Sequence, residues 1–488
     1  MFAIILSLVL LMYLAYRGIS VLILAPILSL MAAGLSGGAP VLATYTQVFM
    51  DALGGYVIKF FPLFLLGAVF GKLMEVTGAA RVLAQAIASR VGADRAALAV
   101  VLACAALTYG GVSLFVVAFA VFPIAAALFS QADLPKRFIP ASIALGAFTF
   151  TMTALPGTPA IQNAIPAPYF GTDAFAAPGL GVIAGLIMFT GGILWLERRI
   201  AAAKARGEGY GEAPPESADG DTEADIAPPP AGGSGQVAGA HGGAVAMASG
   251  HVGTVGALLA ATPIFVVIGL NLILSQFVFP AMDLSYLAQD DFGNAEPGDV
   301  IGLWSIIAAL FAAILTLIAL NWRTLAGRLN DSLTDGVKGS FLPIFNTASE
   351  VGYGTVIASL PAFVAVRDAV TSIAPDNPLI SQAIAVNALA GITGSASGGL
   401  SIALEALGDT YLDLAEAAGI APDLLHRVAA LSSGGFDCLP HNGAVITLLA
   451  ITGLTHRKSY GDIFVVAVAV PVLAVVAVIT LGTMFGSF

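Results

Sequence analysis

Apolar residues dominate the chain in runs that match the length of membrane-spanning helices, for which about 20 residues are needed. Uninterrupted runs lie at residues 2–16, 19–37, 56–76, 178–196, 253–276, 299–320, 339–360 and 462–486. Each half also holds two apolar regions that Gly, Pro and polar residues interrupt, at 96–130 and 138–170 and then at 379–404 and 425–455. Irregular backbone at membrane depth is tolerated only against protein or a wet cavity. The pattern predicts an all-α polytopic membrane protein with broken helices at mid-membrane.

The composition supports this class of protein. Of the 488 residues, 58% are hydrophobic and 10% are charged, whereas about 25% of the residues of soluble globular proteins are charged. Residues 200–252 differ, since they are rich in Ala, Gly, Pro and acidic residues without apolar periodicity. Such a segment cannot bury a core, so we expect a flexible cytoplasmic linker there. It separates a first transmembrane repeat, residues 1–199, from a second, residues 253–488.

The rest of the composition gives no sign of a metal, cofactor or nucleic-acid site. The two cysteines, Cys104 and Cys438, lie in apolar stretches and match no metal or disulfide spacing. The net charge of −11 owes much to the acidic residues of 197–251, and the sequence holds no basic tract. We therefore predict no cofactor, no metal and no nucleic-acid partner.

The two halves share their interruptions. Gly-Gly-Val-Ser at 110–113 has a counterpart in Gly-Ser-Ala-Ser at 394–397, and Leu-Pro-Gly-Thr at 155–158 has one in Leu-Pro-His-Asn at 439–442. Each counterpart follows 284 positions later, as from Gly110 to Gly394. We expect a tandem duplication in which each half has about five transmembrane helices plus one re-entrant hairpin. Coincidence among spans rich in Gly, Ser and Pro is the alternative.

Positive charge near the ends of spans indicates the cytoplasmic side. One threading places there Arg17, Arg81, Arg90, Arg95, Lys136, Arg137, Arg198, Arg199, Lys204, Arg206, Arg323, Arg328, Arg457 and Lys458. It requires 96–130 to enter and leave on one side, and its counterpart 379–404 to open to the outside. The second repeat is then inverted relative to the first, an arrangement found in transporters. Both termini are predicted to be extracytoplasmic, in a cell inner (plasma) membrane.

The hairpin tips are the first candidates for binding a substrate. Their Gly and Ser residues let a ligand approach backbone amides and hydroxyls, and a helix that begins after a tip directs its positive dipole end at an anion. Close helix packing through small residues is the alternative. The predicted substrate-binding residues of the tips are Tyr109, Gly110, Gly111 and Ser113 in the first half and Ser395, Ser397 and Gly398 in the second.

The second interruptions combine Pro and Gly with polar residues inside apolar spans. Here the predicted substrate-binding residues are Thr158, Gln162 and Asn163 in the first half and His441 and Asn442 in the second. A plain proline kink, whose freed carbonyls the Thr and Asn side chains satisfy, is the alternative.

Ionisable side chains at membrane depth are rare and are candidates for function. Glu350 lies deep in its span with no basic residue within ten positions, and Asp437 and His441 flank Pro440. We predict that Glu350, Asp437 and His441 couple transport to protons; for Glu350, a protonated and hydrogen-bonded core residue is the alternative. His441 is the one histidine that falls within a candidate motif. Lys59 is expected to extend to the outer end of its span.

With these motifs the chain resembles the gluconate:proton symporter (GntP) family, part of the ion transporter superfamily. The resemblance covers essentially the whole chain outside the linker and is carried by Leu-Gly-Ala-Val-Phe-Gly-Lys at 66–72, Gly-Ala-Ala-Arg at 78–81, Pro-Gly-Thr-Pro at 156–159, Gly-Ser-Ala-Ser at 394–397 and the segment 433–462. It implies a homodimer with a scaffold and a moving transport domain, an elevator-type mechanism, and uptake of small hydroxycarboxylates with protons.

These features predict a secondary active transporter, not an enzyme, for a hydroxy-monocarboxylate such as gluconate or 3-hydroxybutyrate with proton coupling. A sodium-coupled carboxylate symporter stays open, because hydroxyls, amides and unwound carbonyls also bind hard cations. An anion channel is an alternative of another class, although a channel usually needs a continuous polar lining. A membrane hydrolase built on a serine, His441 and Asp437 is a third alternative, although the sequence lacks a G-x-S-x-G elbow. The expected partners are the anion, the coupling proton, the lipid bilayer and a second copy of the chain.

Overall fold

The computed structural model describes residues 2–17, 19–36, 40–211 and 254–488. Within these ranges the chain is helical and has no strand. Five helical spans are long and apolar enough to cross a membrane: Val41–Val76, Pro178–Ala205, Thr254–Ala281, Pro297–Leu320 and His456–Phe485. Two sharply bent helix pairs raise the number to seven if each pair counts as one span. The prediction of an all-helical chain with several apolar spans is confirmed for these residues, while positions 212–252 of the predicted linker lie outside them.

The first half consists of twelve helices up to the end of the described residues before the linker. They are α1 (Phe2–Tyr16), α2 (Val21–Leu35), α3 (Val41–Ala43), α4 (Met50–Val76), α5 (Ala79–Val91), α6 (Ala96–Tyr109), α7 (Leu114–Gln131), α8 (Ile139–Ala147), α9 (Phe150–Thr153), α10 (Ile161–Ala164), α11 (Ala167–Phe170) and α12 (Pro178–Ala205). A π-helical turn joins α3 to α4, so this span begins well before the predicted residue 56.

The second half begins at α13 and follows a similar order. Its helices are α13 (Thr254–Ile273), α14 (Pro297–Leu320), α15 (Trp322–Leu325), α16 (Leu329–Ser359), α17 (Phe363–Thr371), α18 (Pro378–Thr393), α19 (Ala396–Ala417), α20 (Pro422–Ser433), α21 (Gly443–Thr452), α22 (His456–Phe464) and α23 (Val470–Phe485). The residues at the N-terminus of α18 show why the helix begins there. The Asn377 side chain accepts the backbone N–H of Leu379 at 3.1 Å, and Pro378 occupies the first helical position.

Two boundaries differ from the sequence prediction. Helix α12 continues to Ala205, beyond residue 199, because its last turns are built from Ala, Arg and Lys, which favour helix. Helix α5 fills the region between the span ending at 76 and the predicted hairpin. It buries alanines and Leu83 on one face and exposes Arg81 and Arg90 on the other, and the chain bends by 100° between α5 and α6.

Helix positions recur between the halves. Adding 284 to the bounds of α6 and α7 gives 380–393 and 398–415, and the structure has α18 and α19 at nearly the same positions. The contacts recur as well, because α10 packs on α19 and α20 while α21 packs on α7 and α8. Each half thus places the helix that follows its second interruption against the hairpin and broken helix of the other half.

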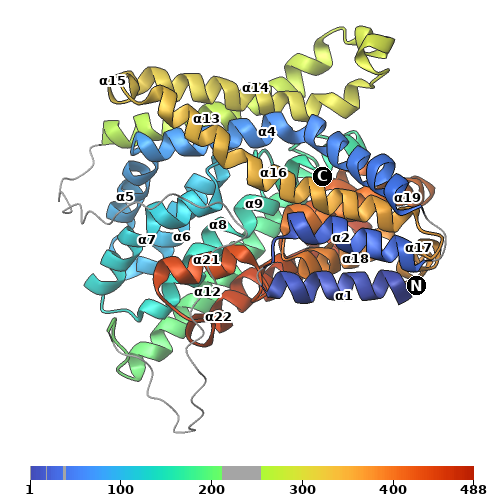
Figure 1. Cartoon of the computed structure of the whole chain (residues 1–488). Helices are drawn as coiled ribbons and strands as arrows, with labels where there is room; N and C mark the ends of the chain where they lie inside the picture. The colour runs from blue at the N-terminus through green and yellow to red at the C-terminus, as the bar shows by residue number, and fades with distance from the viewer. Residues whose placement is uncertain (1, 18, 37–39, 212–253) are drawn as a thin grey trace.

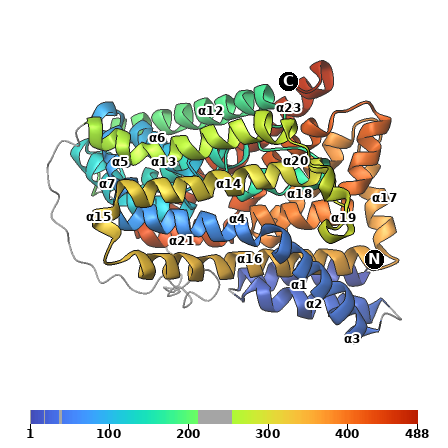
Figure 2. The same ribbon diagram turned by 90° about the horizontal axis from the view of Figure 1, so that it is seen from above.

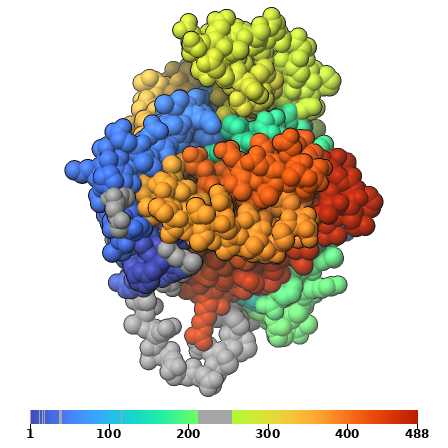
Figure 3. Space-filling model, turned by 90° about the vertical axis from the view of Figure 1, so that its right-hand side faces the viewer, coloured from blue at the N-terminus to red at the C-terminus, as the bar shows by residue number. Residues whose placement is uncertain are grey.

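Equivalent helices also lie side by side in opposite directions. Helix α4 packs along α16, and α12 packs along α23. Helix α4 leads into α5 at one end of the molecule, whereas α16 starts beside α15 at that end and leads into α17 at the other (Figures 1 and 2). The chain termini lie toward the α17 end in Figure 2. Seen from that side, α16 to α19 occupy the centre of the surface, and the segment between α13 and α14 stands above them (Figure 3).

A large hydrophobic core runs through both halves, and a smaller one attaches the first two helices. The smaller core packs α1 and α2 against the last turns of α16, around Leu28, Tyr353 and Val356. The hydroxyl groups of Ser7 and Tyr353 lie 2.8 Å apart within it. The N-terminal pair is therefore fixed to the helix that carries Glu350.

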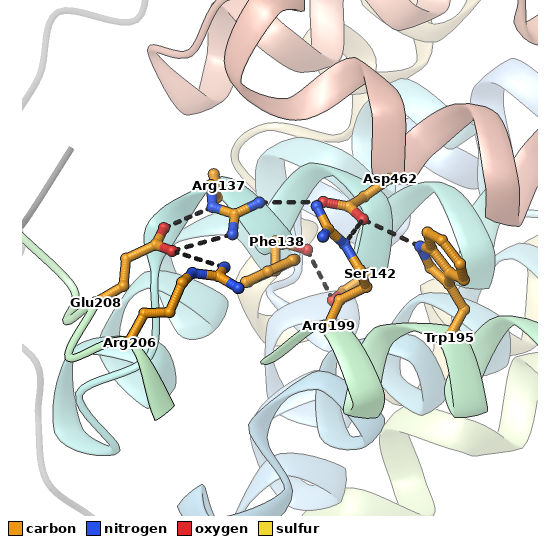
Figure 4. Close-up of polar contacts among 8 residues, drawn as sticks. All are labelled: Arg137, Phe138, Ser142, Trp195, Arg199, Arg206, Glu208 and Asp462. Atoms are coloured by element: carbon orange, nitrogen blue, oxygen red, sulfur yellow. Dashed lines mark hydrogen bonds and ion pairs between the residues drawn. The ribbon is translucent and has the colours of Figure 1, made fainter. Parts of the chain in front are cut away.

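A charged cluster joins the two halves at the end of α12. Arg137 donates to both carboxylate oxygens of Glu208, at 2.6 and 3.0 Å, and to Asp462 of α22 at 3.4 Å (Figure 4). Asp462 also accepts hydrogen bonds from Trp195 at 3.0 Å and Arg199 at 2.9 Å. Three residues after α12 ends, Glu208 is therefore still bound to the helical body.

We expect this cluster to make stability depend on pH in the acid range. The hydrogen bond from Arg137 lowers the pKa of Glu208 below its ordinary value of 4.5, so the stabilisation is complete above that value and is lost as pH falls through the lower, folded-state pKa. Glu208→Gln should remove this dependence, worth about 1 kcal/mol for such an ion pair. Melting temperatures measured from about pH 6 to pH 3 test it, with the exposed pair Arg367–Asp368 as control in Asp368→Asn. Identical pH profiles for wild type and Glu208→Gln would contradict the expectation.

Candidate functional site

The tip of the second hairpin forms a polar helix N-terminus. The chain leaves α18 through Gly394, whose φ of +64° suits glycine. Ser395 then caps α19, because its hydroxyl accepts the backbone N–H of Gly398 at 3.0 Å. The remaining free amides and the dipole of α19 point out of this end of the helix. The predicted residues Ser395, Ser397 and Gly398 thus lie together at an end that favours an anion.

Glu350 of α16 reaches this tip. Its side chain is 3% exposed, and its Oε2 atom has no hydrogen-bond partner among the described residues. A Cβ atom added at Gly398 would overlap that Oε2 atom and lie 2.9 Å from the Ser395 hydroxyl. One turn earlier on α16, the hydroxyl of Thr347 lies 3.4 Å from that of Ser397. Two adjacent turns of α16 therefore contact the first turn of α19.

The second interruption of the second half, at residues 436–443, also contacts this tip. After the 3-10 turn Phe436–Cys438, Asn442 caps α21 by accepting the backbone N–H groups of Ala444 and Val445, and its amide donates to Gly394 O at 2.6 Å. His441 Nε2 donates to Gly391 O at 2.8 Å. The structure therefore brings together the predicted residues Glu350, Ser395, Ser397, Gly398, His441 and Asn442.

Asp437 is buried in this interruption, in the 3-10 turn that packs on α18. Its side chain is 5% exposed, and its Oδ1 atom has no hydrogen-bond partner among the described residues. The same holds for Oδ1 of Asn387 in α18, which a Cβ atom added at Gly435 would contact. These two oxygen atoms offer acceptor capacity that neighbouring side chains do not use.

The tip of the first hairpin packs on the second interruption of the first half. The Tyr109 hydroxyl donates to Pro156 O at 2.7 Å. Gly111 has a φ of +88°, and a Cβ atom added there would lie 2.8 Å from Pro159. Gly110 faces Ile264 of α13 equally closely, while Ser113 is exposed at the start of α7. Gly110 and Gly111 therefore pack closely against Ile264 and Pro159.

The second interruption of the first half, at residues 155–163, is a buried hydrogen-bonded cluster. Asn163 is completely buried, and its amide donates to Thr158 O at 3.1 Å and Ala174 O at 2.9 Å. Thr158 is also completely buried, and its hydroxyl accepts the N–H of Ala160 at 3.3 Å. Gln162 is 8% exposed. The side chains of Asn163 and Thr158 therefore hold the unwound chain in place.

Arg427 of α20, which was not predicted from the sequence as a site residue, lies at the centre of this cluster. It is completely buried, and its guanidinium donates to Ala154 O at 3.2 Å, Ala174 O at 3.4 Å and Asn163 Oδ1 at 3.0 Å. It also donates twice to Ala176 O, at 3.0 and 2.7 Å. All five N–H groups are used, so Arg427 joins the halves and has no N–H left for a substrate carboxylate.

His426, the neighbour of Arg427, was also missed. It is completely buried, with Nδ1 at 2.7 Å from the Thr172 hydroxyl and Nε2 at 3.4 Å from Asn163 Oδ1. His426 therefore belongs to the same hydrogen-bonded cluster as Asn163 and lies outside the motifs selected from the sequence. The adjacent pair His426–Arg427 next to an apolar run was the signal in the sequence.

An open depression of about 590 Å³ lies between α4, α14 and the loop before α14. Its lining includes Lys59, Asp299 and Trp304. Lys59 is exposed, and its Nζ atom lies 5.4 Å from the centre of the Tyr169 ring. Because the span runs from Val41 to Val76, Lys59 lies near its middle and not at its outer end as expected. The depression leaves this face of α4 uncovered by the rest of the described chain.

Comparison with known proteins identifies the class of the molecule. The chain is 44% identical over 493 aligned positions to the uncharacterized transporter YxjC of Bacillus subtilis (strain 168), with 99% of this chain and 98% of the relative covered. The chain belongs to the family of that transporter. No family model matches the sequence. Membership in the YxjC family and the apolar spans together indicate a multi-pass membrane transport protein.

Proposed function

We propose that the protein is a secondary active transporter that takes up a small organic anion, a hydroxy-monocarboxylate such as gluconate or 3-hydroxybutyrate, together with protons. The observation that carries the proposal is the position of the Glu350 carboxyl group, buried against Gly398 at the N-terminus of α19. A substrate carboxylate at that helix end would repel an ionised Glu350, so the bound anion favours the protonated form. Binding of the anion and binding of a proton are thereby linked.

Energetics require such a link. Uptake of one negative charge against a negative-inside potential costs about 2.3 kcal/mol per 100 mV. A proton that enters with the anion cancels this charge movement, and a second proton would make the potential a driving force. Glu350 is the principal proton carrier in this proposal, with Asp437 and His441 as further candidates beside the same interruption. Amides and hydroxyls at the tip suit a single carboxylate rather than a citrate-like trianion.

The arrangement of helices supports an alternating-access mechanism of the elevator type. Equivalent helices α4 and α16 run antiparallel, and the recurrence of helix bounds and contacts is what two inverted repeats require. The basic residues of α5 and α15 lie at the end opposite α17 and the termini, which favours a cytoplasmic position for that end. Membership of the GntP family, a homodimer and the inner membrane are part of the same proposal.

The decisive variant is Glu350→Gln in proteoliposomes. We expect wild-type uptake of labelled 3-hydroxybutyrate or gluconate to rise as external pH falls from about 8 to about 6, near the reference range of histidine. Glu350→Gln should keep substrate exchange but lose proton-driven accumulation, because the amide cannot carry a proton. His441→Ala should weaken binding, since it releases the carbonyl of Gly391 from the interruption.

Two results would contradict this assignment. Accumulation that survives Glu350→Gln, Asp437→Asn and His441→Gln one at a time would remove the coupling site. Flux that never saturates with substrate would point instead to an anion channel. Thr355→Val serves as a control on the same helix, because the Thr355 hydroxyl donates to Val351 O within α16, at 3.0 Å.

Sodium coupling is the second candidate, and a specific observation favours it. The unpaired oxygens of Asn387 and Asp437 are hard ligands, and Asp437 lies in an interrupted segment between α20 and α21. Replacement of sodium by choline at fixed pH separates the two forms of coupling. Uptake that collapses in choline would replace the proton by sodium as the coupling ion.

A further inference from the structure

The buried carboxyl group of Glu350 needs a route to water if it takes up and releases protons. One face of α19 supplies the beginning of such a route. Gly398, Ser401 and Glu405 follow one another at spacings of three and four residues, which places them on the same side of the helix. Gly398 contacts Glu350, Ser401 is completely buried, and Glu405 is exposed.

Two tyrosine hydroxyls lie along this face. The Ser401 hydroxyl donates to the hydroxyl of Tyr56 in α4 at 3.5 Å. The hydroxyl of Tyr169 in α11 donates to Glu405 Oε2 at 2.8 Å. Along this face of α19 the order is therefore Glu350 at Gly398, then Ser401 with Tyr56, and then Glu405 with Tyr169.

Burial is nearly complete for the inner groups, Ser401 included, and decreases toward Glu405. Glu350 and Tyr56 are 3% and 4% exposed, Tyr169 is partly buried, and Glu405 is exposed. Lys59 lies one turn beyond Tyr56, next to the Tyr169 ring, in the lining of the open depression. A row of hydroxyls that begins at a buried carboxyl group and ends at an exposed carboxylate is an arrangement that allows proton transfer.

We propose that Ser401, Tyr56 and Tyr169 form a proton path between Glu405 at the surface and Glu350 at the hairpin tip. The inference rests on the proposed proton coupling at Glu350. Each hydroxyl accepts a proton on its oxygen and passes its own proton to the next group, directly or through one water. The net change is one proton taken from water at Glu405 and one gained by Glu350, with no group oxidised or reduced.

Other charged groups near the path lie at its outer end. Asp409 is exposed on α19 one turn beyond Glu405, and Lys59 of α4 lies over the Tyr169 ring. Helix α2, which also packs on α16, has no titratable residue. The outer carboxylates gather protons from solution, whereas the inner half of the path holds only hydroxyl groups and Glu350.

The rate at which Glu350 becomes protonated tests the path without any substrate. The infrared absorption of the protonated carboxyl group, assigned by its loss in Glu350→Gln, is followed in the purified protein after a rapid fall from about pH 8 to about pH 5. We expect Tyr56→Phe, Tyr169→Phe and Ser401→Ala each to slow its appearance by about tenfold or more, because each removes a proton-transfer group. The final amplitude should not change, since Glu350 is intact.

Tyr353→Phe is the matched control. It removes a buried hydroxyl from the helix of Glu350, but that hydroxyl pairs with Ser7, away from α19, so the wild-type rate is expected. Wild-type rates in Tyr56→Phe and Ser401→Ala would overturn the path while proton coupling at Glu350 stands. A Glu350 carboxyl group that does not titrate at all in the wild type would overturn the coupling site itself. Two independent substitutions at the Ser401–Tyr56 link keep the test valid if one variant fails to fold.

Discussion

Replacement of Arg427 by methionine is expected to lower the stability of the protein by about 3–6 kcal/mol, because buried acceptors that lose their partner cost about 1–3 kcal/mol each. Arg427 supplies hydrogen bonds to the carbonyls of Ala154, Ala174 and Ala176 and to Asn163. Methionine keeps much of the volume, so the loss comes from the hydrogen bonds. Thermal melting of the purified protein, read as loss of the monodisperse species, measures the effect.

Two further variants separate hydrogen bonding from charge. Arg427→Lys keeps the charge but has three donors on one atom in place of a planar fork, so it should recover little of the stability. Arg199→Met removes an arginine that is 39% exposed and makes one ion pair with Asp462, and should cost about 1 kcal/mol or less. Equal melting temperatures for Arg427→Met and the wild type would show that the hydrogen-bonded cluster at residues 155–163 does not depend on Arg427.

The importance of Arg427 could not be predicted from the sequence. A basic residue near the start of an apolar region is ordinarily counted as a charge at the end of a span. The acceptors of its N–H groups lie more than 250 positions earlier in the chain and are mostly backbone carbonyls, which no local pattern encodes. For the same reason Asn163, predicted to bind substrate, is engaged with Arg427 and with its own segment.

The places where the chain changes direction could be predicted from the sequence. Gly, Ser and Pro in apolar runs indicated the interruptions, and α6 ends at Tyr109 and α18 at Thr393, next to the paired motifs. Glu350 was recognisable because a lone carboxyl group in an apolar span is costly. Its contact with Gly398 and the line of hydroxyls toward Tyr56 depend on how α4, α16 and α19 pack, and that information is tertiary.

Substitution at Gly398 is expected to have the largest effect on transport. A methyl group there would overlap the Glu350 carboxyl group, so Gly398→Ala must displace Glu350 or shift the first turn of α19. We expect Gly398→Ala to reduce substrate uptake at least about tenfold, in line with a loss of about 1.4 kcal/mol or more in transition-state or binding energy, and Gly398→Leu to abolish it. Uptake of labelled 3-hydroxybutyrate or gluconate by proteoliposomes measures both.

A double variant distinguishes this contact from general damage to the fold. Glu350→Ala removes the carboxyl group that a methyl at position 398 would meet, so the melting temperature of Gly398→Ala should recover when the two changes are combined, a coupling that independent sites do not show. Gly443→Ala is the matched control, since it starts α21 beside the same tip and a Cβ atom there meets nothing within 4 Å. If Gly398→Ala and Gly443→Ala both transport like the wild type, the hairpin tip has room for a side chain. Glu350 would then not be the group that links a proton to the substrate at this helix end.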